Sequence, residues 1–157
     1  MEEEKYKEQA LLSKKHGRVV VVMVFDEEDQ VVTAAEKVRI CKRSYDVLVN
    51  EIRFPPEDTI LDSNVLTIGI KMEAHVNYDV DFISAVKTIK EQCPYVKISG
   101  GISNLSFGFR GVTKIRESIH SVSLHRAILE SRMDVGIVNS NKMLGLDELE
   151  DDMKHDL

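Results

Sequence analysis

Short apolar runs alternate along the chain with longer stretches of helical periodicity. Residues 19–25 are uninterrupted apolar residues and predict a strand that is buried on both faces. Between residues 33 and 53, apolar or aromatic residues recur at steps of three and four, which predicts an amphipathic helix. Pro55 and Pro56 follow and end that helix. The pattern therefore begins as a strand followed by a helix.

The same alternation continues through the chain. We expect further strands at residues 59–61, 96–98 and 135–138, and further helices at residues 2–16, 78–92 and 112–130. The strands begin roughly 40 residues apart, a spacing that fits one strand, one helix and two loops. Alternating β and α elements require a parallel sheet covered by helices. Two architectures satisfy this: an open doubly wound sheet, or part of an eight-stranded barrel.

Polar residues directly after each strand favour the barrel. They are Asp26, Asp62, Asn104 and Asn139. In (β/α)8 barrels the residues after the strands converge on one rim, whereas an open sheet gathers its site at a single switch point. Four strands cannot close a barrel, and a typical one needs about 250 residues. We therefore expect the α/β class and a TIM-barrel type fold, of which four β/α units form the second half.

Composition restricts the class of protein. Hydrophobic residues make up 43% of the 157 residues and charged residues 31%, as in a soluble globular domain. The net charge of −6 predicts no nucleic-acid surface. Cys41 and Cys93 match no metal or redox spacing and favour a reducing, cytoplasmic setting. No apolar run reaches membrane length, so we expect no membrane partner.

The loop at residues 99–111 carries the clearest candidate chemistry. Its glycines, Gly101 among them, let the backbone approach a ligand closely. Ser103, Asn104 and Ser106 supply neutral donors and acceptors, and Arg110 supplies a planar cation. The loop lies between a predicted strand and a predicted helix, which is a common setting for a ligand site. A glycine-rich surface turn without a ligand is the alternative.

Several segments together resemble a known family. They are VMVFDEE at 22–28, LDSN at 61–64, the loop at 100–111, RESIH at 116–120 and MDVGIVN at 133–139. In order and spacing this set resembles the methyltetrahydrofolate-binding (pterin-binding) domain of cobalamin-dependent methionine synthase. The resemblance implies a (β/α)8 barrel related to dihydropteroate synthase, in which four more strands precede those found here. We expect a partial barrel domain over residues 1–145 and an acidic tail over residues 146–157.

The resemblance also implies an activity and partners. The family domain transfers the N5 methyl group of 5-methyltetrahydrofolate to the cob(I)alamin form of a cobalamin carried on a separate domain. The parent enzyme passes that methyl group to homocysteine. We therefore expect a methyltransferase of methionine biosynthesis, with folate and the cobalamin-binding domain as partners. No metal is expected, because the zinc-binding thiolates of methionine synthase belong to another domain. Ser63 departs from the proline usual in the family.

The matched positions imply roles for single residues. Asn104 matches the catalytic asparagine at N5, and Asp62 matches the carboxylate that binds the pterin ring. Arg110 matches an arginine that helps to hold the anionic folate. The further candidates for folate binding are Asp26, Asn64, Gly101, Ser103 and Asn139. His120 and His125 are five residues apart and face different sides of a helix, so we expect no shared ligand.

Other interpretations remain open from the sequence alone. Asn104 can simply hold a turn, since asparagine tolerates left-handed conformations. Arg110 can pair with a carboxylate on a neighbouring helix. The chain can belong to another pterin-binding barrel, of the dihydropteroate synthase or corrinoid methyltransferase type. A synthase would need a lysine and an anion-binding cluster for its pyrophosphate leaving group. A truncated, non-catalytic binding or assembly module is the alternative outside enzymes.

Overall fold

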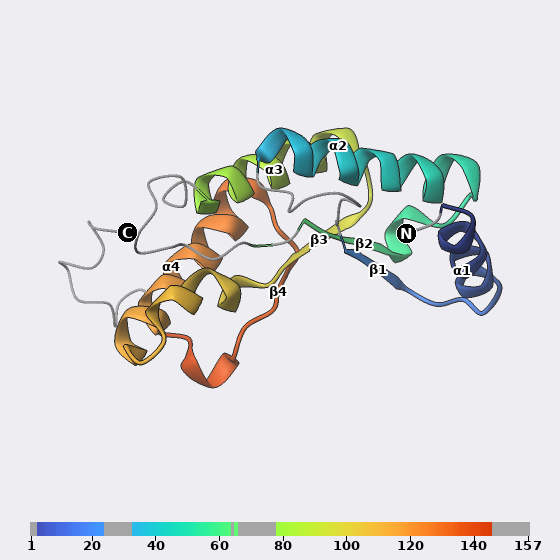
Figure 1. Ribbon diagram of the computed structural model, residues 1–157. Coiled ribbons are helices and arrows are strands. Elements are labelled where there is room, and N and C mark those ends of the chain that lie inside the picture. Colours follow the sequence, from blue (N-terminus) through green and yellow to red (C-terminus); the bar gives the residue numbers. More distant parts are fainter. Residues whose placement is uncertain (1–2, 24–32, 64, 66–77, 146–157) are drawn as a thin grey trace.

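The computed structural model describes residues 3–23, 33–63, 65 and 78–145. Two candidate site residues, Asp26 and Asn64, and the acidic segment 146–157 lie outside these ranges. Helices and strands alternate through the described residues (Figure 1). In chain order they are α1 (Glu3–Lys15), β1 (Val20–Met23), α2 (Ala34–Tyr45), β2 (Thr59–Asp62), α3 (Tyr78–Gln92), β3 (Lys97–Gly100), α4 (Thr113–Ser131) and β4 (Val135–Gly136).

The four strands form one parallel sheet in the order β1-β2-β3-β4. One row of paired residues crosses the whole sheet: Met23, Asp62, Ser99 and Val135. This confirms the predicted parallel sheet and its element order. Consecutive parallel strands joined through helices are the unit from which both barrels and open α/β sheets are built. The sheet is consistent with part of a barrel.

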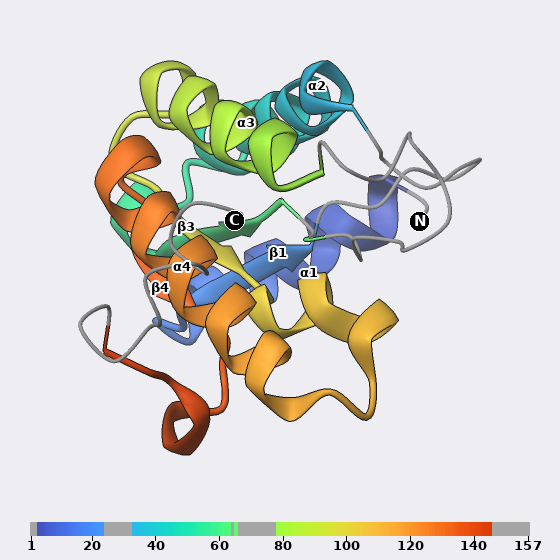
Figure 2. The ribbon, with the colours of Figure 1, turned by 90° about the vertical axis from the view of Figure 1, so that its left-hand side faces the viewer.

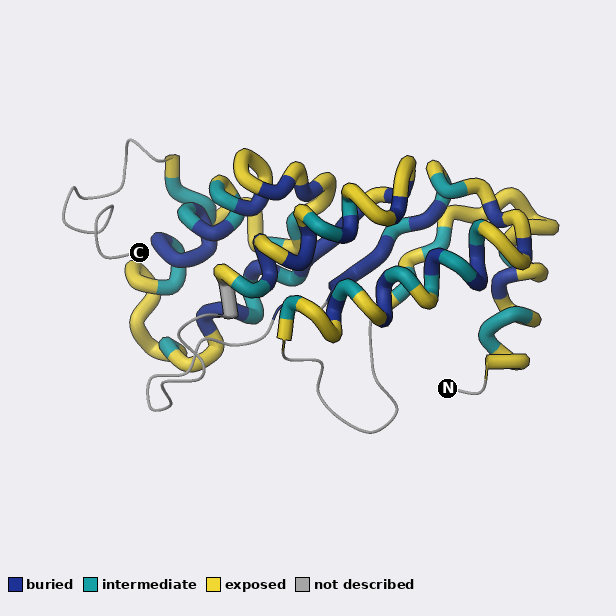
Figure 3. The backbone as a smooth tube through the Cα atoms, turned by 90° about the horizontal axis from the view of Figure 1, so that it is seen from above, coloured by how far each residue is buried: buried dark blue, intermediate teal, exposed yellow. Residues whose placement is uncertain are grey.

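Helices cover one face of the sheet. α2 packs against α3, and α3 packs against α4 (Figure 2). Leu61 and Ile98 are fully buried in a core cluster that also contains Phe82, Val86 and Ile89 of α3. Figure 3 shows the helices buried along the sides that face their neighbours and exposed on their outer sides. Among the described helices, none is both long and apolar enough to cross a bilayer.

The prediction that the first strand is buried on both faces is wrong. Val19, Val21 and Met23 are 58%, 57% and 54% exposed. Val20 and Val22 instead pack against a second cluster of buried residues, which includes Ala10 of α1 and Leu48. Alternate residues of a strand point to opposite faces, and only one face of β1 is covered.

The first turn of α2 determines where this helix begins. Thr33 is the N-cap of α2: its hydroxyl accepts the Glu36 N–H at 3.2 Å, and the Glu36 carboxylate accepts the Thr33 N–H at 3.0 Å. This reciprocal pair is a capping box, which satisfies two donors that a helix start leaves free. After Tyr45 the helix continues as a π-helical segment, Asp46–Glu51. The prediction of one helix from 33 to 53 therefore holds as two joined helical segments.

Candidate functional site

The carboxyl ends of the strands lie at one edge of the sheet, because all four are parallel. Asp62 is the last residue of β2 and is only 6% exposed. Its Oδ2 accepts a hydrogen bond of 2.8 Å from the hydroxyl of Ser99, its neighbour on β3. This bond holds a carboxylate at the rim in a defined position.

Glycine is required where β3 ends. A Cβ on Gly100 would lie 2.6 Å from Cζ of Phe82, so no larger residue fits without moving α3. A Cβ on Gly101 would lie 2.9 Å from Nδ2 of Asn104, whose side chain folds back over this glycine. The Asn104 N–H also donates to the Gly101 carbonyl at 2.9 Å. The predicted loop is in fact built of 3-10 turns, Ile102–Phe109, which hold Asn104 close to the strand end.

Asn104 has the features of a ligand contact. Its side chain is half-buried. The side-chain amide, unlike the backbone N–H, makes no hydrogen bond within the part of the chain that the structure describes. The described residues with positive φ, other than glycine, are Arg53, Tyr95 and Arg132. A left-handed turn therefore does not explain why asparagine stands at position 104. With respect to the described residues, the side-chain amide at the rim keeps its donors and its acceptor available.

Two further candidates lie together beside α4. Ser103 and the exposed Asn139 both line a small hollow of about 150 Å³, together with Thr113, Arg116, Glu117, His120 and Lys142. Asn139 Oδ1 accepts the Asn141 N–H at 3.2 Å, which caps a short 3-10 turn. Arg116 and Lys142 carry positive charge and Glu117 negative charge, so the hollow suits an anionic or a polar ligand group.

Arg110 does not line that hollow. Its guanidinium carbon lies 5.0 Å from the centroid of the Phe107 ring, and both side chains are exposed. Contacts of this kind are cation–π interactions, worth about 0.5–1 kcal/mol at exposed sites. Among the described residues, Arg110 forms no ion pair with a helix carboxylate. The arginine stays accessible at the outer end of the loop.

Sequence reasoning missed a cluster that anchors the loop to α4. Ser106 Oγ lies 2.6 Å from His120 Nε2, and Arg116 Nε donates to the same oxygen at 3.0 Å. The Ser106 hydroxyl also donates a hydrogen bond to the Ser103 carbonyl at 3.3 Å. Burial, and then the charge of Arg116, lower the pKa of His120, so the neutral imidazole is favoured. The available signal was the spacing of Arg116 and His120, four residues apart on one helix face.

A buried lysine beside the rim was also missed. Lys37 of α2 is 2% exposed, and its Nζ donates to the Ser63 carbonyl at 2.8 Å. Burial lowers its pKa to about 8, and nearby Cys41 and Asp62 offset part of that effect. The signal in the sequence was weak: Lys37 lies one helical turn before Cys41, on the buried face of the helix.

The described residues contain no group of three or more histidine, cysteine or acidic side chains able to hold a metal ion. The rim instead presents amides, hydroxyls, one buried carboxylate and separate cations. Donors and acceptors of this kind suit a polar heterocycle with acidic substituents.

The family assignment agrees with this arrangement. A family model described as pterin binding enzyme matches residues 2–139, which includes every described strand and the loop that carries Asn104. The match spans most of the chain and all of the rim. On this ground the chain belongs to the pterin-binding enzyme family.

Proposed function

We propose that this domain transfers the N5 methyl group of 5-methyltetrahydrofolate to a corrinoid, as in cobalamin-dependent methionine synthase. Family membership supports a folate-type ligand. The observation that carries the finer proposal is the half-buried amide of Asn104, held over Gly101 with no hydrogen bond of its own in the described residues. A neutral amide at the rim suits a reaction in which a ring nitrogen changes its protonation state.

Asp62 is proposed to bind the pterin ring. The ring presents a guanidine-like edge with adjacent N–H donors, and a carboxylate accepts two hydrogen bonds from such an edge. The Ser99 hydroxyl fixes one carboxylate oxygen at 2.8 Å, so the orientation is set before the ligand arrives. Buried Lys37 adds positive charge nearby, and Asp62 acts to raise the pKa of that lysine. Together these contacts prepare a carboxylate acceptor.

Asn104 is proposed to act at N5. When the methyl group leaves, the carbon–nitrogen bond breaks and its electron pair stays on N5, so N5 must first gain positive character from a proton. An amide can accept a hydrogen bond from protonated N5 or donate one to the neutral atom. It can therefore stay bonded to N5 throughout the step. A reduced cobalamin, presented by a separate domain, would supply the nucleophile that accepts the methyl group.

The remaining candidates are proposed to hold the rest of the folate. Arg110 is exposed at the outer end of the loop and suits the anionic tail. Ser103 and Asn139 offer hydroxyl and amide groups in the hollow beside α4. Gly101 lets the ligand approach the backbone. Asp26 and Asn64 stay predictions for the same rim, outside the described residues.

A synthase of the dihydropteroate type is the second candidate function. The observation that favours it is the hollow that contains Arg116 and Lys142, since two cations suit a pyrophosphate leaving group. Under this alternative the amide of Asn104 has no protonation change to follow. The two reactions use different substrates and are separable by assay.

The test is single-turnover methyl transfer at saturating 5-methyltetrahydrofolate, measured on this segment within a closed eight-stranded barrel. Asn104→Ala should slow transfer by about 10²-fold or more, because the lost bond matters most in the transition state. Asp62→Asn should instead weaken folate binding, since an amide offers only one acceptor oxygen. Asn50→Ala, on the π-helical segment that follows α2, is the matched control. Transfer at the parent rate by Asn104→Ala would refute the proposed role of the amide.

A further inference from the structure

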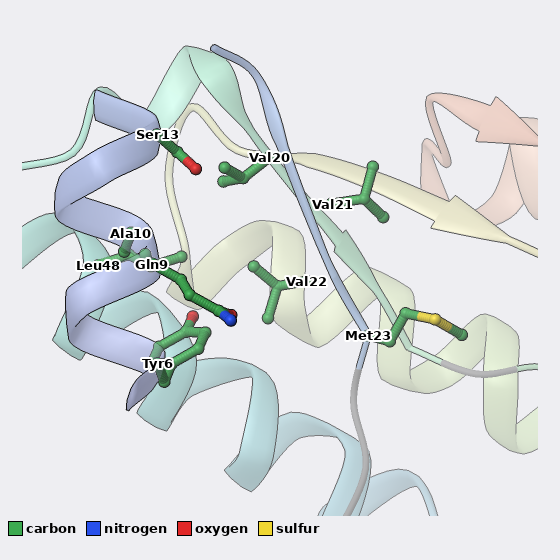
Figure 4. Close-up of a pocket in the computed structure, with 9 residues that line it drawn as sticks. All are labelled: Tyr6, Gln9, Ala10, Ser13, Val20, Val21, Val22, Met23 and Leu48. Carbon is green, nitrogen blue, oxygen red and sulfur yellow. The ribbon is translucent and has the colours of Figure 1, made fainter. Parts of the chain in front are cut away.

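The space between α1 and β1 is lined mostly by apolar side chains. Its volume is about 350 Å³, and Figure 4 shows Val20 and Val22 on the side of β1 that faces α1. The family resemblance places a preceding strand of the same domain beside β1, and apolar side chains suit packing against such a strand. We therefore treat this space as a packing surface. Buried polar groups lie elsewhere, where the loop that carries Asn104 meets α4.

Asn104 stands on a segment that depends on its neighbours for its shape. Ile102–Phe109 forms eight residues of 3-10 helix. Runs of more than about four residues are uncommon in this geometry, because its hydrogen bonds are poorly aligned. Gly101 precedes the segment without a side-chain cap, and the Asn104 side chain makes no hydrogen bond to the described residues. The position of the Asn104 amide is therefore set by whatever anchors the segment.

Three buried residues attach this segment to the rest of the fold. Ile102 and Leu105 are fully buried in the core cluster, where apolar contacts hold them without a preferred direction. Ser106 is also fully buried, and its hydroxyl makes the directional contacts. Its oxygen lies 3.0 Å from Arg116 Nε and 2.6 Å from His120 Nε2. Since hydrogen bonds weaken steeply with misalignment, this pair fixes the orientation of the segment against α4.

The hydrogen bonds around Ser106 indicate where the protons lie. Arg116 is always a donor, so it occupies one lone pair of the Ser106 oxygen. The Ser106 hydroxyl donates to the Ser103 carbonyl at 3.3 Å. His120 Nε2 then carries its proton and donates to the remaining lone pair of Ser106. Nδ1, which has no partner among the described residues, is left as an acceptor, and an unpaired buried acceptor is less unusual than an unpaired donor.

The helix on the other side of this bond is firmly packed. α4 is 19 residues long, and His120 lies near its middle with 5% of its surface exposed. Ile119, the preceding residue, is 3% exposed and belongs to the core cluster. The bond between His120 and Ser106 therefore ties the 3-10 segment to a rigid part of the fold.

We propose that His120 is a positioning residue for methyl transfer: its bond to Ser106 holds the 3-10 segment so that the Asn104 amide meets N5 of the folate. This inference rests on the proposed function of Asn104. Ser106 is two residues from Asn104, so a shift of the anchor moves the amide with it. A displacement of about 1 Å at a reacting group costs up to about 100-fold in rate. Binding of the pterin ring, assigned to Asp62 on β2, should change much less.

The first experiment follows the anchor in the 157-residue chain without folate. The Asn104 N–H donates to the Gly101 carbonyl at 2.9 Å, so its hydrogen exchange reports how firmly the segment is held. His120→Leu should speed this exchange about 10-fold, the effect of one lost hydrogen bond on local opening. His120→Gln keeps a donor and should keep the parent rate.

His125→Leu, at an exposed histidine of the same helix, is the matched control and should also keep the parent rate of exchange. Circular dichroism checks that each variant folds. Should His120→Leu fail to fold, Ser106→Ala breaks the same bond by removing a single oxygen and serves in its place. Unchanged exchange at Asn104 in a folded variant that lacks this bond would overturn the proposal.

The second experiment is a double-mutant cycle in the closed barrel that tests the proposed function. Ser106→Ala should slow single-turnover methyl transfer at saturating folate by about 10- to 100-fold, while the folate dissociation constant stays close to that of the parent. In the Asn104→Ala background, Ser106→Ala should have no further effect on the rate, because no amide is left to position. Equal slowing in both backgrounds would overturn the proposal, since the effect would then not pass through Asn104.

The two experiments separate the failure of this inference from the failure of the proposed function. Transfer at the parent rate by Asn104→Ala refutes the proposed role of the amide and, with it, the positioning role in methyl transfer. Exchange at Asn104 that does not respond to loss of the bond between His120 and Ser106 refutes the positioning role alone, whatever the rate of transfer.

Discussion

Replacing Lys37 by methionine should change how the stability of this domain depends on pH. The Lys37 side chain is 2% exposed, and its ammonium donates to the Ser63 carbonyl at 2.8 Å. Burial lowers its pKa from 10.5 to about 8, with Cys41 and Asp62 acting in the opposite direction. Methionine has a similar length and carries no charge, so the variant keeps the packing and removes the titration.

The sign and size of the effect follow from the two pKa values. Below pH 8 the folded and the unfolded chain both hold the Lys37 proton, so this group adds no pH dependence. Between pH 8 and 10.5 the unfolded chain binds more protons, so the free energy of unfolding rises with pH. The difference between the pKa of 10.5 in the unfolded chain and about 8 in the folded chain corresponds to on the order of 3 kcal/mol in the free energy of unfolding. Most of this increase is complete by pH 10.

The assay is urea unfolding of the parent chain and Lys37→Met at pH 7 and pH 10. Burial raises the pKa of Cys41 to about 12 and that of Cys93 to about 11, so both thiols destabilise the fold at high pH. The loss from Cys93 occurs in both proteins and cancels in the comparison. The charge of Lys37 lowers the pKa of Cys41, so removing Lys37 raises that pKa further and adds to the expected difference in the same direction. From pH 7 to pH 10 the free energy of unfolding of the parent should rise by about 2–3 kcal/mol relative to that of the variant.

Lys87→Met makes the same chemical change at an exposed lysine of α3 and should show no such difference. If the parent and Lys37→Met change equally between pH 7 and pH 10, the desolvation of Lys37 inferred from its burial is wrong.

Two further predictions concern the loop that carries the candidate site. Gly100→Ala should lower the free energy of unfolding by about 1–3 kcal/mol, because the new methyl group would lie 2.6 Å from Phe82 Cζ; an unchanged urea midpoint would contradict this. Ser106→Ala should cost about 1–3 kcal/mol, because it removes the shared partner of His120 and Arg116. Hydrogen exchange should then speed up in the loop more than in the sheet, and uniform exchange would argue against an anchoring role.

Local patterns in the sequence were sufficient to place the elements. The predicted helix at 78–92 is found at Tyr78–Gln92, and the predicted helix at 2–16 is found at Glu3–Lys15. Alternation of strands and helices required a parallel sheet, and the sheet is parallel. These features follow from periodicity and chain connectivity, which act over a few residues and need no knowledge of distant contacts. Parallel order also placed Asp62 and the Asn104 loop at the same edge.

Tertiary packing decided the features that periodicity does not report. A run of valines in β1 is compatible with burial on one face or on both, and only the position of the helices shows that Val21 is exposed. Lys37 resembles a surface lysine until α2 packs over the end of β2. Ser106, Arg116 and His120 meet only when α4 folds back on the loop. The sequence by itself determined which elements form and in what order. The tertiary structure determined which of their side chains lose water, because that depends on neighbours distant along the chain.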